Sequence, residues 1–154
     1  MLKIDMHTHI MPRTMPDFAR KFGYGDFIML NHVEPGTANM MQGRRFFRKI
    51  TENCWNPEIR ISEYETYNTQ VQVVCTIPVL FSYWAKPEDG AEVARFLNDD
   101  LARSIAPFPK NYIGLGTLPM QDTDLAIKEL RHCKELGFPG VQIGSNINDK
   151  NLDE

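Results

Sequence analysis

Apolar residues after position 56 follow two alternating patterns. Residues 71–77, 112–118 and 140–144 are short and largely apolar, which is typical of strands buried on both faces of a sheet. The segments between them carry apolar residues at three- and four-residue spacing. This spacing, together with N-capping residues at Asn56 and Asp122, predicts helices over residues 57–68, 87–105 and 123–136.

Each predicted helix has an apolar side that we expect to pack on a sheet. The residues expected on these sides are Ile59, Tyr64 and Tyr67 in the first helix, Ala94, Leu97, Leu101 and Ile105 in the second, and Ala126, Leu130 and Cys133 in the third. Gly137 is well placed to end the third helix.

The first 56 residues differ from the rest of the chain. Residues 2–6 alternate between apolar and polar, which predicts a short strand that leads directly into His7-Thr8-His9. Residues 11–56 contain many glycines and prolines and predict an irregular insertion with one hairpin, turning at Glu34-Pro35-Gly36. An insertion of this length in a domain is usually functional, for example as a lid or a pocket wall.

The order of strand, insertion and alternating helices and strands predicts an α/β fold with a parallel sheet. This order fits either a doubly wound sheet or a TIM-type β/α barrel. The glycine-rich nucleotide-binding motifs GxGxxG and GxxxxGK[ST] do not occur, which removes the main support for the doubly wound alternative. A barrel needs about 250 residues, so we expect residues 1–154 to form about four β/α units, the amino-terminal portion of a partial barrel domain.

Composition restricts the possible partners. The 154 residues include 17 Lys and Arg against 20 Asp and Glu, a net charge of −3, so no nucleic acid partner is expected. No apolar stretch approaches the roughly 20 residues of a membrane helix, and no secretory leader is evident, so we expect a cytoplasmic protein with no membrane partner. We expect Cys54, Cys75 and Cys133 to be buried apolar residues rather than disulfide partners.

His7 and His9 are the strongest candidates for chemistry. Residues two apart on a strand point to the same side, so both imidazoles can reach one divalent ion at the carboxyl end of the strand. Asp5 is expected to support them as a hydrogen-bonding partner. A catalytic zinc usually has three protein ligands, yet we expect His32 to be a loop residue and His132 a solvated helix residue. The remaining ligands must therefore come from outside this chain.

A second candidate is the basic cluster of residues 44–49. One arginine from this cluster facing a pocket would bind a carboxylate of an acidic substrate through its planar fork, whereas the alternative is a solvated strand edge. Alternation places Arg44, Phe46 and Arg48 on one face. The aromatic residues of segment 81–84 either line the mouth of the same pocket as the basic cluster or pack within their loop.

The segment Ile4-Asp5-Met6-His7-Thr8-His9 resembles the amidohydrolase superfamily, whose first barrel strand carries an HxH metal motif. Further segments resemble the zinc-dependent decarboxylases of this superfamily. They are Phe22-Gly23-Tyr24-Gly25, Glu52-Asn53-Cys54-Trp55, residues 78–89, residues 114–121 and residues 137–144. The resemblance covers nearly the whole chain but only the amino-terminal half of the family's barrel.

This resemblance implies a cofactor-free, non-oxidative decarboxylation of an acidic muconate semialdehyde in tryptophan catabolism, which diverts the substrate from quinolinate formation. It implies that His7 and His9 hold zinc with a histidine and an aspartate from later strands, and that Arg48 binds a substrate carboxylate. It further implies a cytoplasmic homodimer and an acid/base histidine beyond residue 154, so that no catalytic residue lies within this chain and the chain alone is inactive. Two alternatives remain open: a noncatalytic half-barrel fragment that acts only by association, and a metal-dependent amidohydrolase acting on an amide or lactone.

Overall fold

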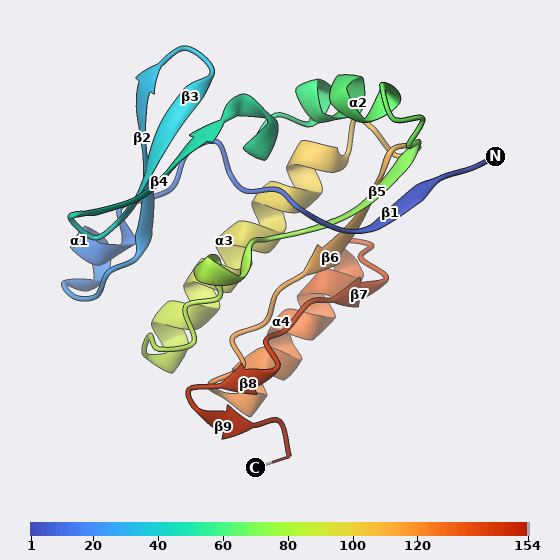
Figure 1. Ribbon diagram of the computed structural model, residues 1–154. Helices are drawn as coiled ribbons and strands as arrows, with labels where there is room; N and C mark the ends of the chain where they lie inside the picture. The colour runs from blue at the N-terminus through green and yellow to red at the C-terminus, as the bar shows by residue number, and fades with distance from the viewer. Residues whose placement is uncertain (154) are drawn as a thin grey trace.

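A parallel sheet of four strands organises the protein, as the computed structural model of residues 1–153 shows (Figure 1). The strands are β1 (Ile4–His9), β5 (Val71–Cys75), β6 (Tyr112–Gly116) and β7 (Gly140–Val141), and they lie in the order β1-β5-β6-β7. All three neighbouring pairs are parallel. The predicted α/β fold with about four parallel strands is therefore confirmed.

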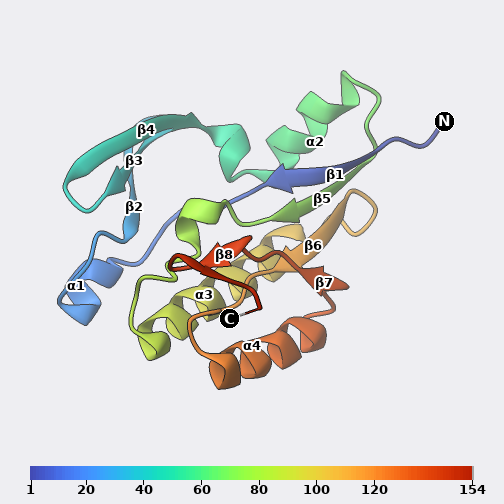
Figure 2. The same cartoon turned by 60° about the horizontal axis from the view of Figure 1, so that its bottom comes forward.

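Three helices connect these strands: α2 (Pro57–Glu65), α3 (Pro87–Ile105) and α4 (Thr123–Glu135). Their starts follow the predicted caps, because the Asn56 side chain accepts from the Glu58 amide and the Asp122 side chain accepts from the Leu125 amide. Gly137 follows α4 with a φ of 85°, a conformation that favours glycine. In Figure 2 the strands lie one below another, with α2 beside β1 and α4 beside β7.

The insertion is more regular than predicted. It contains a short helix, α1 (Phe18–Phe22), and an antiparallel sheet of β2 (Ile28–Glu34), β3 (Thr37–Gln42) and β4 (Arg45–Thr51), followed by the 3₁₀ turn η1 (Glu52–Cys54). The predicted hairpin at residues 34–36 joins β2 to β3, and a second, unpredicted hairpin joins β3 to β4. Strand β4 could not be predicted from alternating apolar and polar residues, because all its residues except Ile50 are exposed.

Two apolar clusters hold these layers together. The first packs the insertion against α3 and the segment after β5, and its most deeply buried members include Phe18, Phe27, Met40, Leu80 and Val93. The second lies between the sheet and helices α3 and α4, around Val74, Leu101, Tyr112, Ala126 and Cys133. Because the first cluster includes both insertion and barrel residues, the insertion is fixed to the sheet rather than hanging from it.

Two helix faces differ from the prediction. The helix α2 ends at Glu65 rather than near residue 68, so Tyr67 lies outside it and is exposed, as is Ile59, and the buried residue of α2 is Arg60. In α4, Leu130 is exposed and Glu129 is buried. Both polar residues can occupy inward positions because each finds hydrogen-bond partners there. Apolar periodicity cannot indicate such positions.

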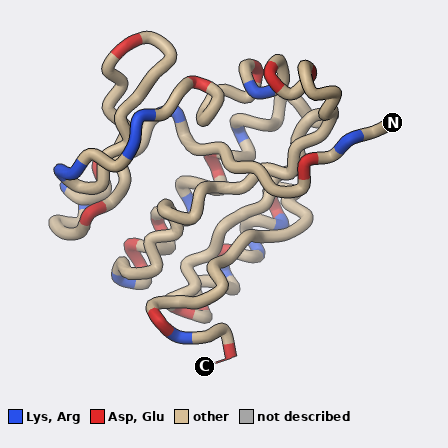
Figure 3. Tube along the Cα trace, in the orientation of Figure 1, with Lys and Arg blue, Asp and Glu red and all other residues tan. Residues whose placement is uncertain are grey.

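The chain beyond β7 forms a small hairpin of β8 (Asn146–Ile147) and β9 (Lys150–Asn151). Acidic and basic residues are interspersed along the chain (Figure 3). Of the helices in the described part of the protein, none is long and apolar enough to cross a bilayer.

Candidate metal-binding and substrate site

The imidazole rings of His7 and His9 lie next to each other at the carboxyl end of β1. Their centroids are 4.8 Å apart and the rings are nearly perpendicular, at 87°. The pairing of β1 with β5 shifts register between Asp5 and Thr8, so the strand is irregular where it approaches the two histidines. The HxH spacing thus brings the two rings together, as predicted.

The ring of His9 is oriented by the end of the neighbouring strand. Its Nδ1 lies 3.1 Å from the carbonyl oxygen of Thr76, which can only accept, so Nδ1 donates and Nε2 keeps a free lone pair. The Cys75 Sγ lies 3.5 Å from the same nitrogen. Burial lowers the pKa of His9 below 6.5 and nearby His7 adds to the shift, while the Thr76 carbonyl opposes it. The net lowering of the His9 pKa favours the neutral imidazole, the form that binds metal ions.

The thiol of Cys75, which lies beside the His9 ring, is a neutral group. Burial raises the pKa of its thiol to about 11, and its Sγ donates to the Thr8 carbonyl at 3.4 Å. Cys133 is also buried and Cys54 is partly buried. Asp5, near the amino end of β1, supports the backbone rather than a histidine ring, because its carboxylate accepts from the His7 amide at 3.2 Å and from the Tyr64 hydroxyl at 3.1 Å.

These residues fit part of a divalent metal site. Two neighbouring imidazoles, one of them fixed by a backbone carbonyl, are the usual nitrogen donors for zinc and related ions. Among residues 1–153, no group of three or more His, Cys, Asp and Glu side chains could hold a metal ion. The chain can therefore supply His7 and His9 as two ligands of such a centre.

We expect the 154-residue chain to bind zinc only weakly, because two imidazoles leave most of a catalytic ligand set unfilled. Equilibrium dialysis against a mild chelator should remove the ion. Stoichiometric zinc that resists the chelator and is lost in His7→Ala would show that the site is more complete than two ligands.

The other two histidines lie elsewhere, and neither is placed as predicted. His132 is not a solvated residue: its Nε2 lies 2.6 Å from the Asp99 carboxylate and links α4 to α3. His32 lies on strand β2 rather than in a loop, and its Nε2 donates to the Arg13 carbonyl at 2.7 Å. Sequence reasoning could not identify these hydrogen-bond partners, because each lies far from its histidine along the chain.

A cavity of about 580 Å³ opens beyond the carboxyl ends of β5 and β7. This volume lies within the range of small-molecule sites, and the carboxyl ends of strands are where β/α barrels bind their ligands. The segment 81–84 lines the cavity, but no residue of the basic cluster 44–49 does, and Phe81 also stacks on Tyr83 with ring centroids 5.2 Å apart, so both predicted alternatives hold in part. The lining also includes residues that sequence reasoning missed, namely Gln42, Pro78, Val79, Gln142, Ile143, Gly144, Ser145, Asn146 and Asn148. Sequence reasoning could have found Gln142, because it lies within the predicted fourth strand, residues 140–144, and the carboxyl ends of barrel strands bind ligands.

Arg48 lies on β4, opposite Met40 of β3. Its guanidinium is 5.6 Å from the centroid of the Phe47 ring and its side chain is exposed. Within residues 1–153 it makes no hydrogen bond, ion pair or ring contact with either histidine, and it does not line the large cavity. Arg44 precedes β4, and the pairing of β3 with β4 shifts register between Met40–Arg48 and Met41–Phe46, so the regular alternation predicted for Arg44, Phe46 and Arg48 is interrupted at Phe47. The structure thus presents Arg48 as an exposed cation on the insertion, next to the Phe47 ring.

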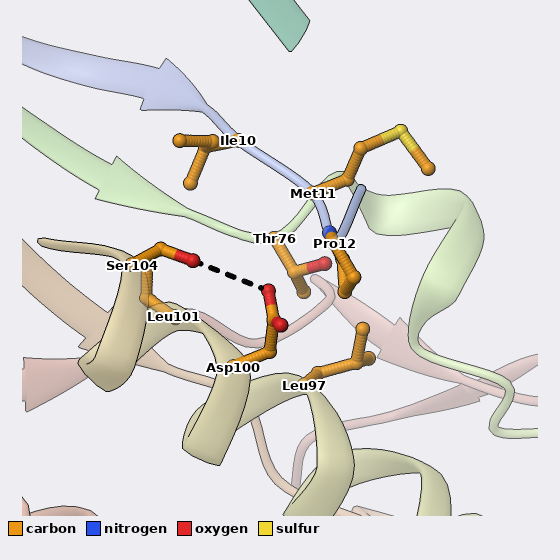
Figure 4. Close-up of a pocket in the computed structure, with 8 residues that line it drawn as sticks. All are labelled: Ile10, Met11, Pro12, Thr76, Leu97, Asp100, Leu101 and Ser104. Carbon is orange, nitrogen blue, oxygen red and sulfur yellow. Dashed lines mark hydrogen bonds between the residues drawn. The ribbon is translucent and has the colours of Figure 1, made fainter. Parts of the chain in front are cut away.

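A second cavity lies between the strand ends and α3 (Figure 4). It measures about 10 Å³ and contains the Asp100 carboxylate, which accepts from Ser104 at 3.5 Å. Burial raises the pKa of Asp100, whereas Arg103 and Ser104 oppose the shift. This cavity has room for about one water molecule, so it is too small for a substrate.

Comparison with known proteins places the chain in a family. The model of the amidohydrolase family matches residues 4–154. The 2-amino-3-carboxymuconate-6-semialdehyde decarboxylase of Dictyostelium discoideum is 51% identical over 154 residues, which are 99% of this chain and 43% of that protein. The chain thus spans less than half the length of this relative.

Solved structures share the fold at lower identity. The apo structure of Metarhizium anisopliae IDCase superposes with a TM-score of 0.75 at 16% identity, covering 99% of this chain and 45% of that one. The 5-carboxyvanillate decarboxylase of Novosphingobium aromaticivorans, complexed with manganese, gives a TM-score of 0.71 at 22% identity, covering 99% and 44%. Because the family model matches nearly the whole sequence, this chain belongs to the amidohydrolase family.

Proposed function

We propose that this chain is part of a zinc-dependent decarboxylase that acts on 2-amino-3-carboxymuconate 6-semialdehyde. The observation that carries the proposal is the 51% identity to the Dictyostelium decarboxylase over 99% of the chain. The paired rings of His7 and His9 at the end of β1 support the metal, since the carboxyl ends of barrel strands carry catalytic groups. In this role the protein belongs to tryptophan catabolism and diverts its substrate from quinolinate formation.

The residues of this chain would bind and orient the reactants. His7 and His9 would hold the zinc ion, with Thr76 fixing the ring of His9. Arg48 would bind a substrate carboxylate. A bound divalent ion supplies a Lewis acid for oxygen atoms that gain negative charge. Decarboxylation breaks the bond between the carboxylate carbon and the substrate, releases carbon dioxide and places a proton on the carbon left behind. We assign this proton transfer to a histidine outside residues 1–154.

The decarboxylation test distinguishes this function from hydrolysis. We propose that the whole protein is a homodimer in the cytoplasm. Loaded with zinc, it should consume the semialdehyde and release carbon dioxide without an organic cofactor. Removal of the ion should abolish the reaction. Hydrolysis of amides or lactones, with the semialdehyde left unchanged, would contradict the assignment and favour the amidohydrolase alternative.

The 154-residue chain alone should be inactive in the same assay. Decarboxylation by this chain would mean that a complete site assembles from its residues, for example across a dimer.

A second candidate function, a noncatalytic half-barrel that acts by association, is favoured by one observation. Ile127 and Leu130 are exposed on α4, and Leu2, Ile4 and Met6 are exposed in and just before β1. Inactivity combined with association with a longer copy of the protein would support this alternative.

A further inference from the structure

Helix α2 carries an arginine that is buried without an acidic partner. Arg60 is 8% exposed, although arginine is rarely buried unless it is paired. Within the part of the chain that the structure describes, no carboxylate forms an ion pair with it. A buried charge without a counter-ion lowers stability, so the position of this side chain calls for a role other than stabilising the core.

The guanidinium of Arg60 joins three separate segments. Its Nη2 donates to the Thr8 hydroxyl and to the Gln72 side-chain oxygen, both at 2.8 Å, and its Nη1 donates to the Asn53 carbonyl at 3.0 Å. Thr8 lies on β1 and Gln72 on β5, and both are buried. The rigid fork of one arginine thus ties the first two strands of the sheet to the end of the insertion.

The contact with Thr8 falls between the two candidate metal ligands. Thr8 is buried against the guanidinium, whereas His7 is exposed and His9 is half-buried, so anchoring the Thr8 side chain on the helix side leaves the flanking histidines on the other side. The backbone needs this support, because the register of β1 shifts between Asp5 and Thr8. Tyr64, one helical turn beyond Arg60, provides a second contact through its bond to Asp5.

We propose that Arg60 is a positioning residue for the histidine pair: through Thr8 it sets the direction in which His7 and His9 present their rings to a divalent ion. The inference rests on the proposed metal site but concerns geometry that exists before the ion binds. Loss of a group that hydrogen-bonds directly to a zinc ligand typically costs 10- to 100-fold in metal affinity; Arg60 acts one contact further from the ligands, so we expect an effect at the lower end of this range. Helix α2 is then part of the site although none of its residues touches the metal.

Nuclear magnetic resonance of the histidine rings tests the proposal in the 154-residue chain. Thr8→Val removes the hydroxyl with little change of shape, and Arg60→Met removes the guanidinium. In both variants we expect the contact between the His7 and His9 ring protons to weaken. Nitrogen shifts should show His9 losing its single Nδ1-protonated form, and a zinc titration followed by the same ring signals should show Kd raised about 10-fold.

Matched variants separate this role from a general loss of stability. Thr117→Val is the control for Thr8→Val, because Thr117 is also buried at a strand end and its hydroxyl makes no hydrogen bond within residues 1–153. Arg95→Met is the control for Arg60→Met, because Arg95 bonds to buried Glu129 on α4, away from β1. Both controls should keep the wild-type ring contact, the Nδ1-protonated form of His9 and the wild-type zinc affinity. Arg60→Lys should lose less of these properties than Arg60→Met does.

Each outcome has a distinct meaning. Wild-type ring contacts and zinc affinity in Thr8→Val would overturn the proposal, even if Arg60→Met does not fold. Equal effects in Thr117→Val would also overturn it, because they would reflect general destabilisation. If the unaltered chain shows no zinc response at all, the metal assignment of the proposed function fails, whereas the ring contacts still decide whether Arg60 positions the pair.

Discussion

Asn98→Ala is expected to lower the free energy of unfolding by about 3–5 kcal/mol. Asn98 is 1% exposed on α3, and its amide nitrogen donates to the Thr117 carbonyl at 2.9 Å and to the Glu129 carboxylate at 2.7 Å. Its side-chain oxygen accepts from the Thr117 amide at 2.8 Å. Alanine would leave all three buried groups without this partner, and each unsatisfied group costs about 1–3 kcal/mol.

Urea unfolding of the 154-residue chain, followed by circular dichroism, measures this loss. Asn31→Ala is the control, because Asn31 is exposed on β2 and its loss should change stability by less than about 0.5 kcal/mol. A change in Asn98→Ala as small as that of the control would show that α3, β6 and α4 do not depend on the shared network. The expected loss is large because folded proteins are stable by only about 5–15 kcal/mol.

The elements around the sheet were predictable because their signals are local. The Pro87 start of α3 and the Asp122 cap of α4 mark helix starts within a few residues of sequence. The strand predictions over 112–118 and 140–144 extended past the observed ends of β6 and β7. Those extra residues continue the apolar pattern but lie in loops, where they line the cavity or pack in the core.

The inward polar residues were not predictable by the same reasoning. The apolar periodicity of α2 and α4 does not mark Arg60 and Glu129 as buried, since their hydrogen-bond partners lie on other elements. Asn98 was missed for the same reason. A buried charge is acceptable only when distant groups satisfy it, and the periodicity of one helix contains no information about those groups.

The candidate site was predictable in part. The HxH spacing placed two rings together because a strand has a fixed two-residue period. The Thr76 carbonyl, which orients His9, follows the adjacent strand 67 residues later and emerges only when β1 and β5 pair. The role of Arg48 came from a family resemblance, and the structure adds that Arg48 is exposed on β4 and forms no ion pair with a carboxylate of residues 1–153.

Arg48→Ala in the whole protein is expected to lower kcat/KM for the semialdehyde about 100-fold, or about 3 kcal/mol, because a charge-assisted pair with a substrate carboxylate is lost. Its side chain is exposed, so its removal should leave the melting temperature and zinc content nearly unchanged. Steady-state kinetics with metal analysis measures both properties.

Arg48→Lys distinguishes the planar fork from simple charge. An ammonium group keeps the positive charge but cannot form two parallel hydrogen bonds with a carboxylate, so the lysine variant should recover only part of the activity. Arg45→Ala is the matched control, since Arg45 is exposed on the same strand and bonds to Gln42 through its guanidinium. Normal kinetics in Arg48→Ala, or an equal loss in Arg45→Ala, would remove Arg48 from the substrate site and leave β4 as a solvated edge of the insertion.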